Sequence, residues 1–183
     1  GRIEEILNTP VTVDDNPNGK LLPAFTDKIE FRNVRFAYED VVILDDLSTG
    51  FADRVPTGVP FGQPDIADRA AVAKAIADYG ITGVVHLAAR KQVGESVSDP
   101  LGYWEWNVSR MVTFLDTLRK AGVKQFVYSS SAAVYGNPTD GKTPLTELAE
   151  CKPINPYGAT KLAGEILIDS LATVGELNGI SLR

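Results

Sequence analysis

The sequence has little that could support disulfides, metal sites or membrane spans. Among 183 residues there are one cysteine, Cys151, and one histidine, His86. A single cysteine excludes an intrachain disulfide, as is usual in a reducing compartment, and a single histidine leaves few ligands for a metal. No apolar run reaches the ~18 residues that a membrane span needs, and the N-terminus has no basic-then-apolar signal pattern. We therefore expect a cytoplasmic protein with no metal site and no membrane partner.

Positive charge is also scarce. The chain has 18 Lys and Arg residues against 24 Asp and Glu residues, a formal net charge of −6. Nucleic acids bind basic surfaces, so no nucleic-acid partner is expected. The hydrophobic share of 44% is normal for a globular protein, and the length suffices for one domain with a core. A phosphorylated small molecule stays compatible with this charge, because a few N–H groups or one lysine can bind it.

The chain changes character near residue 40. Residues 1–40 combine a polar loop with one β-rich stretch, Lys28 to Tyr38. From Val41 onward, apolar runs typical of buried strands alternate with helical patterns. The strands are expected at 41–44, 83–87, 125–129 and from Ile180, and the helices at 69–79, 100–121 and from Pro156. This alternation predicts an α/β fold with a Rossmann-like doubly wound parallel sheet over 41–183.

The N-terminal stretch cannot join that sheet in the parallel sense. Only a tight turn separates Tyr38 from Val41, whereas a parallel neighbour needs a crossover of about a dozen residues. We therefore expect an added antiparallel N-terminal strand, and we interpret residues 1–40 as a segment foreign to the domain that follows.

Helix-boundary signals support the expected helices. Asp68 is a candidate N-cap with Gly80 at the C-terminal end of the same helix. Asp99 and Asn155 are each followed by proline, which favours the first position of a helix.

Three residues form the candidate catalytic group. Tyr157 and Lys161 are four residues apart, so a helix places them on one face, about one turn apart. Ser131 lies just past the carboxyl end of the strand 125–129, where ligands bind in open α/β sheets. A nearby lysine favours the tyrosine phenolate, and a serine can bond the same substrate hydroxyl. Such a set can move a proton off a carbinol.

Each of these residues also has a simpler interpretation. A Tyr–Lys pair at helical spacing is common by chance, and a run of three serines is more often a plain loop. The order along the chain favours catalysis, because the strand and Ser131 precede Tyr157 by 26 residues. For His86, packing in or beside the core is the simpler interpretation.

Several motifs carry a resemblance to a known family. Tyr157 to Lys161 reads YGATK and is similar to the YxxxK signature of the extended short-chain dehydrogenase/reductase family. Val127 to Gly136 reads VYSSSAAVYG, which is similar to the version in UDP-glucose 4-epimerases. HLAARKQVGES from His86 and VVILDDLSTG from Val41 resemble two further epimerase motifs in the same order. Dehydratases of this branch carry acids where this chain has Ser131-Ala132-Ala133, so dehydration is disfavoured.

The resemblance implies NAD as cofactor and a UDP-sugar as substrate, with epimerisation at C4 between UDP-glucose and UDP-galactose. Tyr157 would act as base, Lys161 would tune it and hold the nicotinamide ribose, and Ser131 would bridge to the sugar hydroxyl. On the adenosine side, the acids after the first strand would bind ribose, and the next pair would flank adenine. The implied cofactor-binding residues, apart from Tyr157 and Lys161, are Asp45, Asp46, Asp65, Ile66, Leu87, Ala88, Ala89 and Lys91.

The chain also departs from that family. None of the 16 glycines forms GxxGxxG or GxGxxG, the turn that holds a pyrophosphate. In the helix after residue 100, where the family usually reads YYxNNVxGT, Trp106 replaces the first Asn and Arg110 replaces the Gly. The substrate domain expected after Ile180 is absent, so exposed apolar surface and self-association or a homo-oligomer are expected.

Residues 28–38 instead resemble the first strand of the nucleotide-binding domain of ATP-binding-cassette exporters, after a linker-like segment. There Tyr38 would stack on adenine, but the match stops before any phosphate loop, so ATP hydrolysis is not expected. The chain is therefore interpreted as a chimera. Two alternatives to an active UDP-glucose 4-epimerase stay open: an NAD-dependent epimerase for another sugar nucleotide, and an inactive fragment without a pyrophosphate turn.

Overall fold

The computed structural model describes residues 41–137 and 145–183. The expected N-terminal strand, its antiparallel pairing and Tyr38 lie outside these ranges. The described part is an α/β structure in which every strand pairing is parallel, which confirms the predicted fold class.

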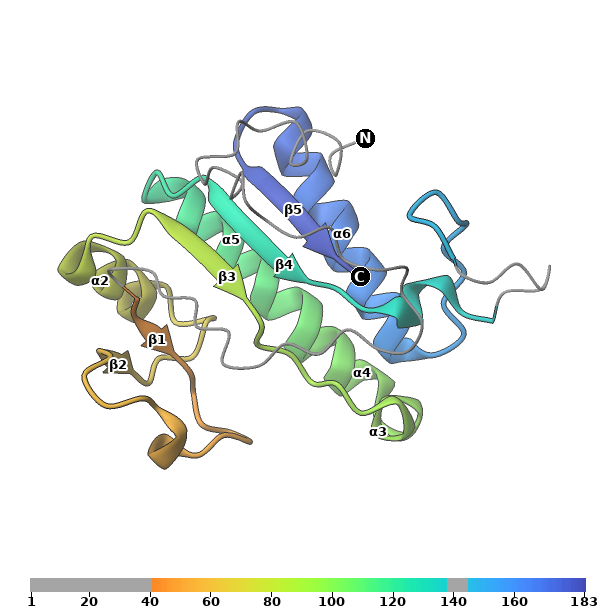
Figure 1. Cartoon of the computed structure of the whole chain (residues 1–183), viewed down its shortest axis with the longest axis horizontal. Coiled ribbons are helices and arrows are strands. Elements are labelled where there is room, and N and C mark those ends of the chain that lie inside the picture. The colour runs from red at the N-terminus through yellow and green to blue at the C-terminus, as the bar shows by residue number, and fades with distance from the viewer. Residues whose placement is uncertain (1–40, 138–144) are drawn as a thin grey trace, which may run out of the picture. The chain divides into compact units, whose positions relative to one another are not determined.

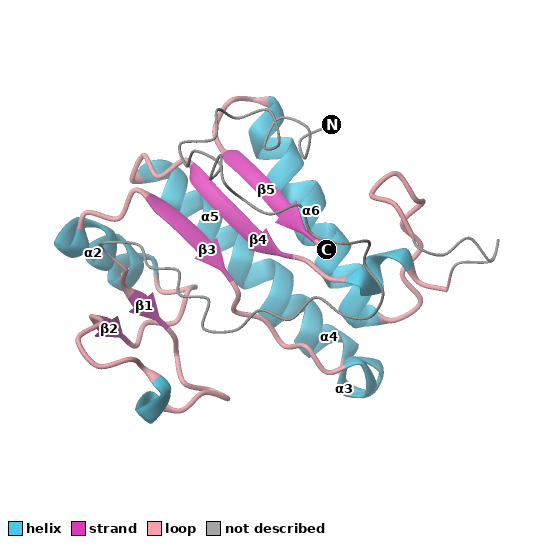
Figure 2. Cartoon of the chain, viewed as in Figure 1, coloured by secondary structure: helices cyan, strands magenta, loops and turns pink. Residues whose placement is uncertain are grey.

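The strands form two groups (Figures 1 and 2). The larger sheet has the order β3 (Gly83–His86), β4 (Gln125–Ser129) and β5 (Asn178–Leu182), with Val85, Val127 and Ile180 in register. The smaller sheet pairs β1 (Ile43–Leu44) with β2 (Phe61–Gly62). β1 is shorter than the predicted 41–44, and β2 was not predicted, because two residues are too few to show a strand pattern.

The helices alternate with the strands as expected. They are α2 (Arg69–Tyr79), α3 (Val93–Ser98), α4 (Pro100–Trp104), α5 (Arg110–Lys120) and α6 (Pro156–Thr173), with short 3₁₀ helices η1 (Ala52–Arg54) and η3 (Ala132–Tyr135). Between α4 and α5 the helix widens to a π-helical segment, η2 (Glu105–Ser109). The sequence predicted one continuous helix there. α3 was not predicted.

The helix ends form for the reasons that the sequence indicated. Asp68 accepts a hydrogen bond from Ala71 N at 3.0 Å. Asp99 does the same from Gly102 N at 3.0 Å, and Asn155 from Gly158 N at 2.8 Å. Gly80 ends α2 with φ of 61°, in the left-handed region that glycine adopts without strain.

The core lies between one face of the larger sheet and the helices behind it (Figure 2). It is built from α2, α5, α6, β4 and the turns after α5 and α6, namely Val72, Ile76, Met111, Phe114, Leu115, Leu118, Val123, Phe126, Tyr128, Ile168 and Leu177. His86 lies against Phe114, Phe126 and Tyr128, as the packing interpretation expected. Alternate strand residues point to the opposite face, where Val85 and Leu182 are more than half exposed.

No helix in the described ranges is long and apolar enough to cross a membrane. The same ranges contain no group of three or more His, Cys, Asp or Glu side chains placed to hold a metal ion.

Candidate functional site

The carboxyl end of β4 and the first turns of α6 form one site. Lys161, only 3% exposed, donates from Nζ to the carbonyl oxygen of Ser129 at 2.7 Å. Ser131 is the N-cap of η3, and its Oγ accepts from Ala133 N at 3.2 Å. The helix packs closely on this turn, because a Cβ built on Gly158 would lie 2.6 Å from the Ala133 carbonyl oxygen. The structure therefore brings the segments of Ser131, Tyr157 and Lys161 together.

Burial shapes the electrostatics of this site. Desolvation lowers the pKa of Lys161 to about 8, and its ammonium group lies 4.9 Å from the centroid of the Tyr128 ring. Burial, followed by the charge of Lys161, lowers the pKa of His86 to about 4. Burial, and then the charges of Glu165 and Tyr157, raise the pKa of Tyr128. His86 and Tyr128 are therefore neutral at pH 7, and they lie near a lysine whose pKa is close to neutral pH.

A buried ion pair supports the serine turn, and the sequence reasoning missed it. Glu165, 5% exposed, accepts from Ser130 Oγ and from Arg183, whose Nη2 lies 2.6 Å from Oε2. Arg183 also donates to the Tyr135 hydroxyl at 3.1 Å and to the Glu147 carbonyl oxygen at 3.2 Å. Hydrogen bonding to Glu165 is the main cause that raises the pKa of Arg183. The one available signal was spacing, since Glu165 follows Lys161 by four residues on the same helix.

Asn107 forms a second missed support. Its Oδ1 accepts from Arg90 N at 2.8 Å, and its Nδ2 donates to Arg90 O at 2.9 Å and to Thr160 Oγ1 at 3.1 Å. Thr160 in turn donates to the Tyr157 carbonyl oxygen at 2.8 Å. Asn107 lies in the π-helical segment, a helix irregularity often found at functional sites. It ties the loop after β3 to the turn of α6 that carries Tyr157.

The residues expected to bind the adenosine half lie at the carboxyl ends of β1 and β2. Because these strands are parallel, their carboxyl ends share one edge. There Asp45 accepts from Leu47 N and Asp46 from Ser48 N, both at 2.8 Å. Asp65 accepts from Ala67 N at 2.9 Å and pairs with Arg110, while Ile66 packs against the core.

Leu87, Ala88, Ala89 and Lys91 follow directly on the carboxyl end of β3. Leu87 is exposed, and its neighbour Arg90 is held at its backbone by Asn107. The described structure therefore collects the expected residues at the carboxyl edges of both sheets, where ligands bind in such folds.

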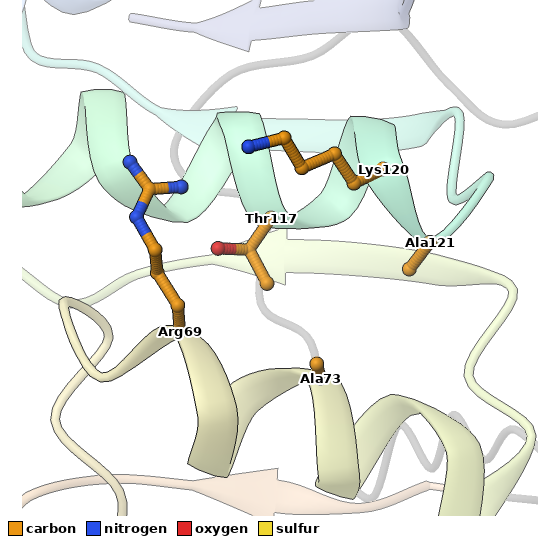
Figure 3. A pocket seen from close by; sticks show the side chains of 5 residues that line it. All are labelled: Arg69, Ala73, Thr117, Lys120 and Ala121. Carbon is orange, nitrogen blue, oxygen red and sulfur yellow. The ribbon is translucent and has the colours of Figure 1, made fainter.

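A shallow pocket of about 260 Å³ lies elsewhere, between α2 and α5 (Figure 3). It is lined by Arg69, Ala73, Thr117, Lys120 and Ala121. The two cations in it are both paired with Asp116, which also accepts from Arg119. None of the expected site residues lines this pocket, so it belongs to the helix packing and not to the candidate site.

One glycine pattern needs a correction. Gly136 to Thr143 spells GxxxxGK[ST], the sequence pattern of a phosphate loop. ATP hydrolysis was not expected because no phosphate loop was found, so this pattern was missed. A phosphate loop joins a strand directly to a helix, whereas Gly136 follows η3 and α6 begins only at Pro156. Gly136 is needed for packing instead, since a Cβ there would lie 1.9 Å from the Lys152 carbonyl oxygen. Residues 138–144 lie outside the described ranges.

Residues 30–183 match the NAD dependent epimerase/dehydratase family. The chain belongs to this family. Among the similar curated proteins, the UDP-glucose 4-epimerase of Streptomyces lividans is 42% identical over 147 residues, which is 80% of this chain and 44% of that protein. The UDP-glucose 4-epimerase of Corynebacterium glutamicum is 43% identical over 144 residues, 79% of this chain and 43% of that protein. The chain thus spans less than half the length of these relatives.

Solved structures of the epimerase/dehydratase family agree with the fold. A UDP-glucose 4-epimerase from Brucella ovis in complex with NAD has a TM-score of 0.74 at 37% identity, over 78% of this chain and 43% of that one. A UDP-glucose 4-epimerase from Thermotoga maritima with UDP-glucose has a TM-score of 0.72 at 28% identity, over 78% and 46%. The family match begins at residue 30. The resemblance of residues 28–38 to cassette exporters stays a prediction.

Proposed function

We propose that this chain forms the NAD-binding and proton-transfer part of an epimerase that acts on a UDP-sugar at C4. The observation that carries the proposal is the hydrogen bond from Lys161 to the Ser129 carbonyl oxygen, with Tyr157 one turn earlier on the same helix. This contact holds the helix of the candidate base against the strand end beside Ser131. Family membership and the NAD-bound structural neighbours support the choice of cofactor.

The residues at the carboxyl end of β1 fit the adenine-side ribose of a dinucleotide. Carboxylates are acceptor-only groups, and the exposed Asp45 accepts a hydrogen bond from Leu47 N at Oδ1. It therefore has acceptor capacity left for the two hydroxyls of a ribose, and its charge disfavours a 2′-phosphate, so NAD suits it better than NADP. When bound, NAD would supply a hydride acceptor at the sugar carbon.

The chain's own residues would handle the proton. Tyr157 would take the proton from the sugar 4-hydroxyl, with Ser131 bridging, and would return it after the sugar has turned over. The fixed bond to Ser129 keeps the ammonium group of Lys161 in place, one turn after Tyr157 on the same helix. Because O4 would lose a proton and C4 a hydride, the intermediate would be a 4-keto sugar. Inversion at C4 would follow when the hydride returns to the opposite face of C4 and the proton returns to O4.

The test is NAD binding by calorimetry, followed by an assay of UDP-galactose conversion. We expect micromolar binding that Asp45→Ala weakens, and conversion that Tyr157→Phe abolishes with binding retained. Binding without conversion in the parent would favour the inactive-fragment alternative. Absence of binding in the parent would overturn the proposal.

A related substrate is the second candidate. Two structural neighbours are a UDP-Glc/GlcNAc 4-epimerase and a UDP-N-acetylglucosamine 4-epimerase, at 31% and 30% identity. UDP-N-acetylgalactosamine is therefore assayed beside UDP-galactose. Faster conversion of the acetylated sugar would assign this second substrate class. A cytoplasmic location stays a prediction.

A further inference from the structure

A cluster of four side chains joins the carboxyl end of β2 to the start of α5. Arg110 donates from Nη1 to the carboxylate of Asp65. The guanidinium carbon of Arg110 lies 3.6 Å from the centroid of the Trp106 ring, and that of Arg90 lies 4.8 Å from it. We call Asp65, Arg90, Trp106 and Arg110 the Trp106 cluster.

The cluster depends on two residues of one helix face. Trp106 and Arg110 are four positions apart, in the π-helical segment and the first turn of α5. They are two of the four positions where residues 103–111 depart from the YYxNNVxGT pattern, with Trp for the first Asn and Arg for Gly. A glycine has no side chain to reach Asp65, so the ion pair arises from the residue at position 110 in this chain.

Arg110 has few alternatives to Asp65. Its side chain is 20% exposed, and its Nε atom is buried with no hydrogen-bond partner among the described residues. The guanidinium group is therefore held by one carboxylate and one aromatic ring, and both contacts strengthen when water is excluded. Asp65 is held at both oxygens, by Arg110 at Oδ2 and by Ala67 N at Oδ1.

We propose that Arg110 is a positioning residue that aims the Asp65 carboxylate at the adenine of a bound dinucleotide, and so sets a preference for adenine over hypoxanthine. The proposal rests on the proposed function. Each carboxylate oxygen keeps a second acceptor direction, and the amino group is the donor on the adenine edge. Hypoxanthine has an oxygen at that position, which a carboxylate repels. Arg110 touches no reacting atom, so its effect belongs to cofactor affinity.

The experiment compares NADH with nicotinamide hypoxanthine dinucleotide, reduced form, by calorimetry on the full chain. The parent is expected to prefer NADH about tenfold, the range of a hydrogen bond to a charged group. Arg110→Met should weaken the binding of NADH about tenfold and leave the affinity for the hypoxanthine analogue nearly unchanged, so that the preference disappears. Arg119→Met is the matched control, an exposed arginine on α5 paired with Asp116, and should keep the parent's preference.

A second variant protects the test from a loss of folding. Asp65→Asn keeps the shape of the side chain. With its amide oxygen on Arg110, its amide nitrogen takes the place of Oδ1, where it loses the bond from Ala67 N and can donate to an oxygen of the ligand. We expect this variant to prefer the hypoxanthine analogue. The inference would be overturned, with the proposed function intact, if Arg110→Met weakened the binding of both ligands equally or if both variants kept the parent's preference. A parent that binds neither dinucleotide would overturn the proposed function, and the inference with it.

Discussion

Lys161 is a cation almost without contact with water, held by one carbonyl oxygen and one aromatic ring. Its lowered pKa, about 8, means that burial of the charge costs stability at neutral pH. We expect Lys161→Met to raise the free energy of unfolding by about 1–2 kcal/mol, after the lost bond to Ser129 is subtracted. Urea denaturation at pH 7 measures this. An equal or lower stability would show that the bond outweighs the burial.

The same variant should abolish epimerase activity if the proposed function holds, since Tyr157 then loses its neighbouring charge. As pH rises from about 8 to the usual lysine range, the folded parent loses its proton before the unfolded chain does. The stability of the parent should therefore rise toward that of Lys161→Met over this interval.

His86 should make the fold sensitive to mild acid. Its pKa in the fold is about 4, below its ordinary value of 6.5, chiefly because it is buried among aromatic rings. Between these two values the unfolded chain binds a proton that the folded chain refuses, so stability falls as pH falls, by about 3 kcal/mol over the whole interval. The comparison is His86→Phe, measured by urea denaturation at pH 7, 5 and 4. A constant difference between parent and variant would contradict the prediction.

At the scale of elements, α6 approaches β4 through a glycine. A Cβ on Gly164 would lie 2.4 Å from the Tyr128 hydroxyl oxygen, and Tyr128 is fully buried. Gly164→Ala should therefore lower the free energy of unfolding by about 2 kcal/mol, as overpacking in a core does. Gly94→Ala in α3 is the control, because nothing lies within 4 Å of its Cβ position. Thermal denaturation of both variants measures this effect, and equal melting temperatures for the two would contradict a close contact between Gly164 and Tyr128.

The helices and strands were largely predictable from the sequence, but the long-range side-chain contacts that hold them together were not. Helix caps such as Asp68 and Asn155 act on backbone groups a few residues away, so local sequence is enough to find them. Asn107 and Glu165 act across 17 and 18 residues or more, on Arg90 and Arg183. Nothing in their immediate neighbourhood marks them, because their partners come from other elements.

At the scale of the whole molecule, one face of the larger sheet carries exposed apolar side chains. Val85, Leu87 and Leu182 are all more than half exposed. Exposed apolar surface of this kind favours association. We expect the 183-residue chain to self-associate in light scattering, and Val85→Thr with Leu182→Thr to shift it toward monomer. Leu148→Thr, an exposed loop leucine, should change nothing. A monodisperse parent would contradict the expectation.

The sequence by itself determined the fold class, the main helices with their caps, and the order of Ser131, Tyr157 and Lys161, because these depend on periodicity and short-range spacing. Whether the three segments meet was a matter of tertiary structure, through the bond of Lys161 to Ser129 and the close packing of Gly158 on η3. The Trp106 cluster is likewise decided only by the tertiary structure. Asp65 and Arg110 are 45 residues apart, and only the folding of β2 beside the start of α5 lets the two charges pair.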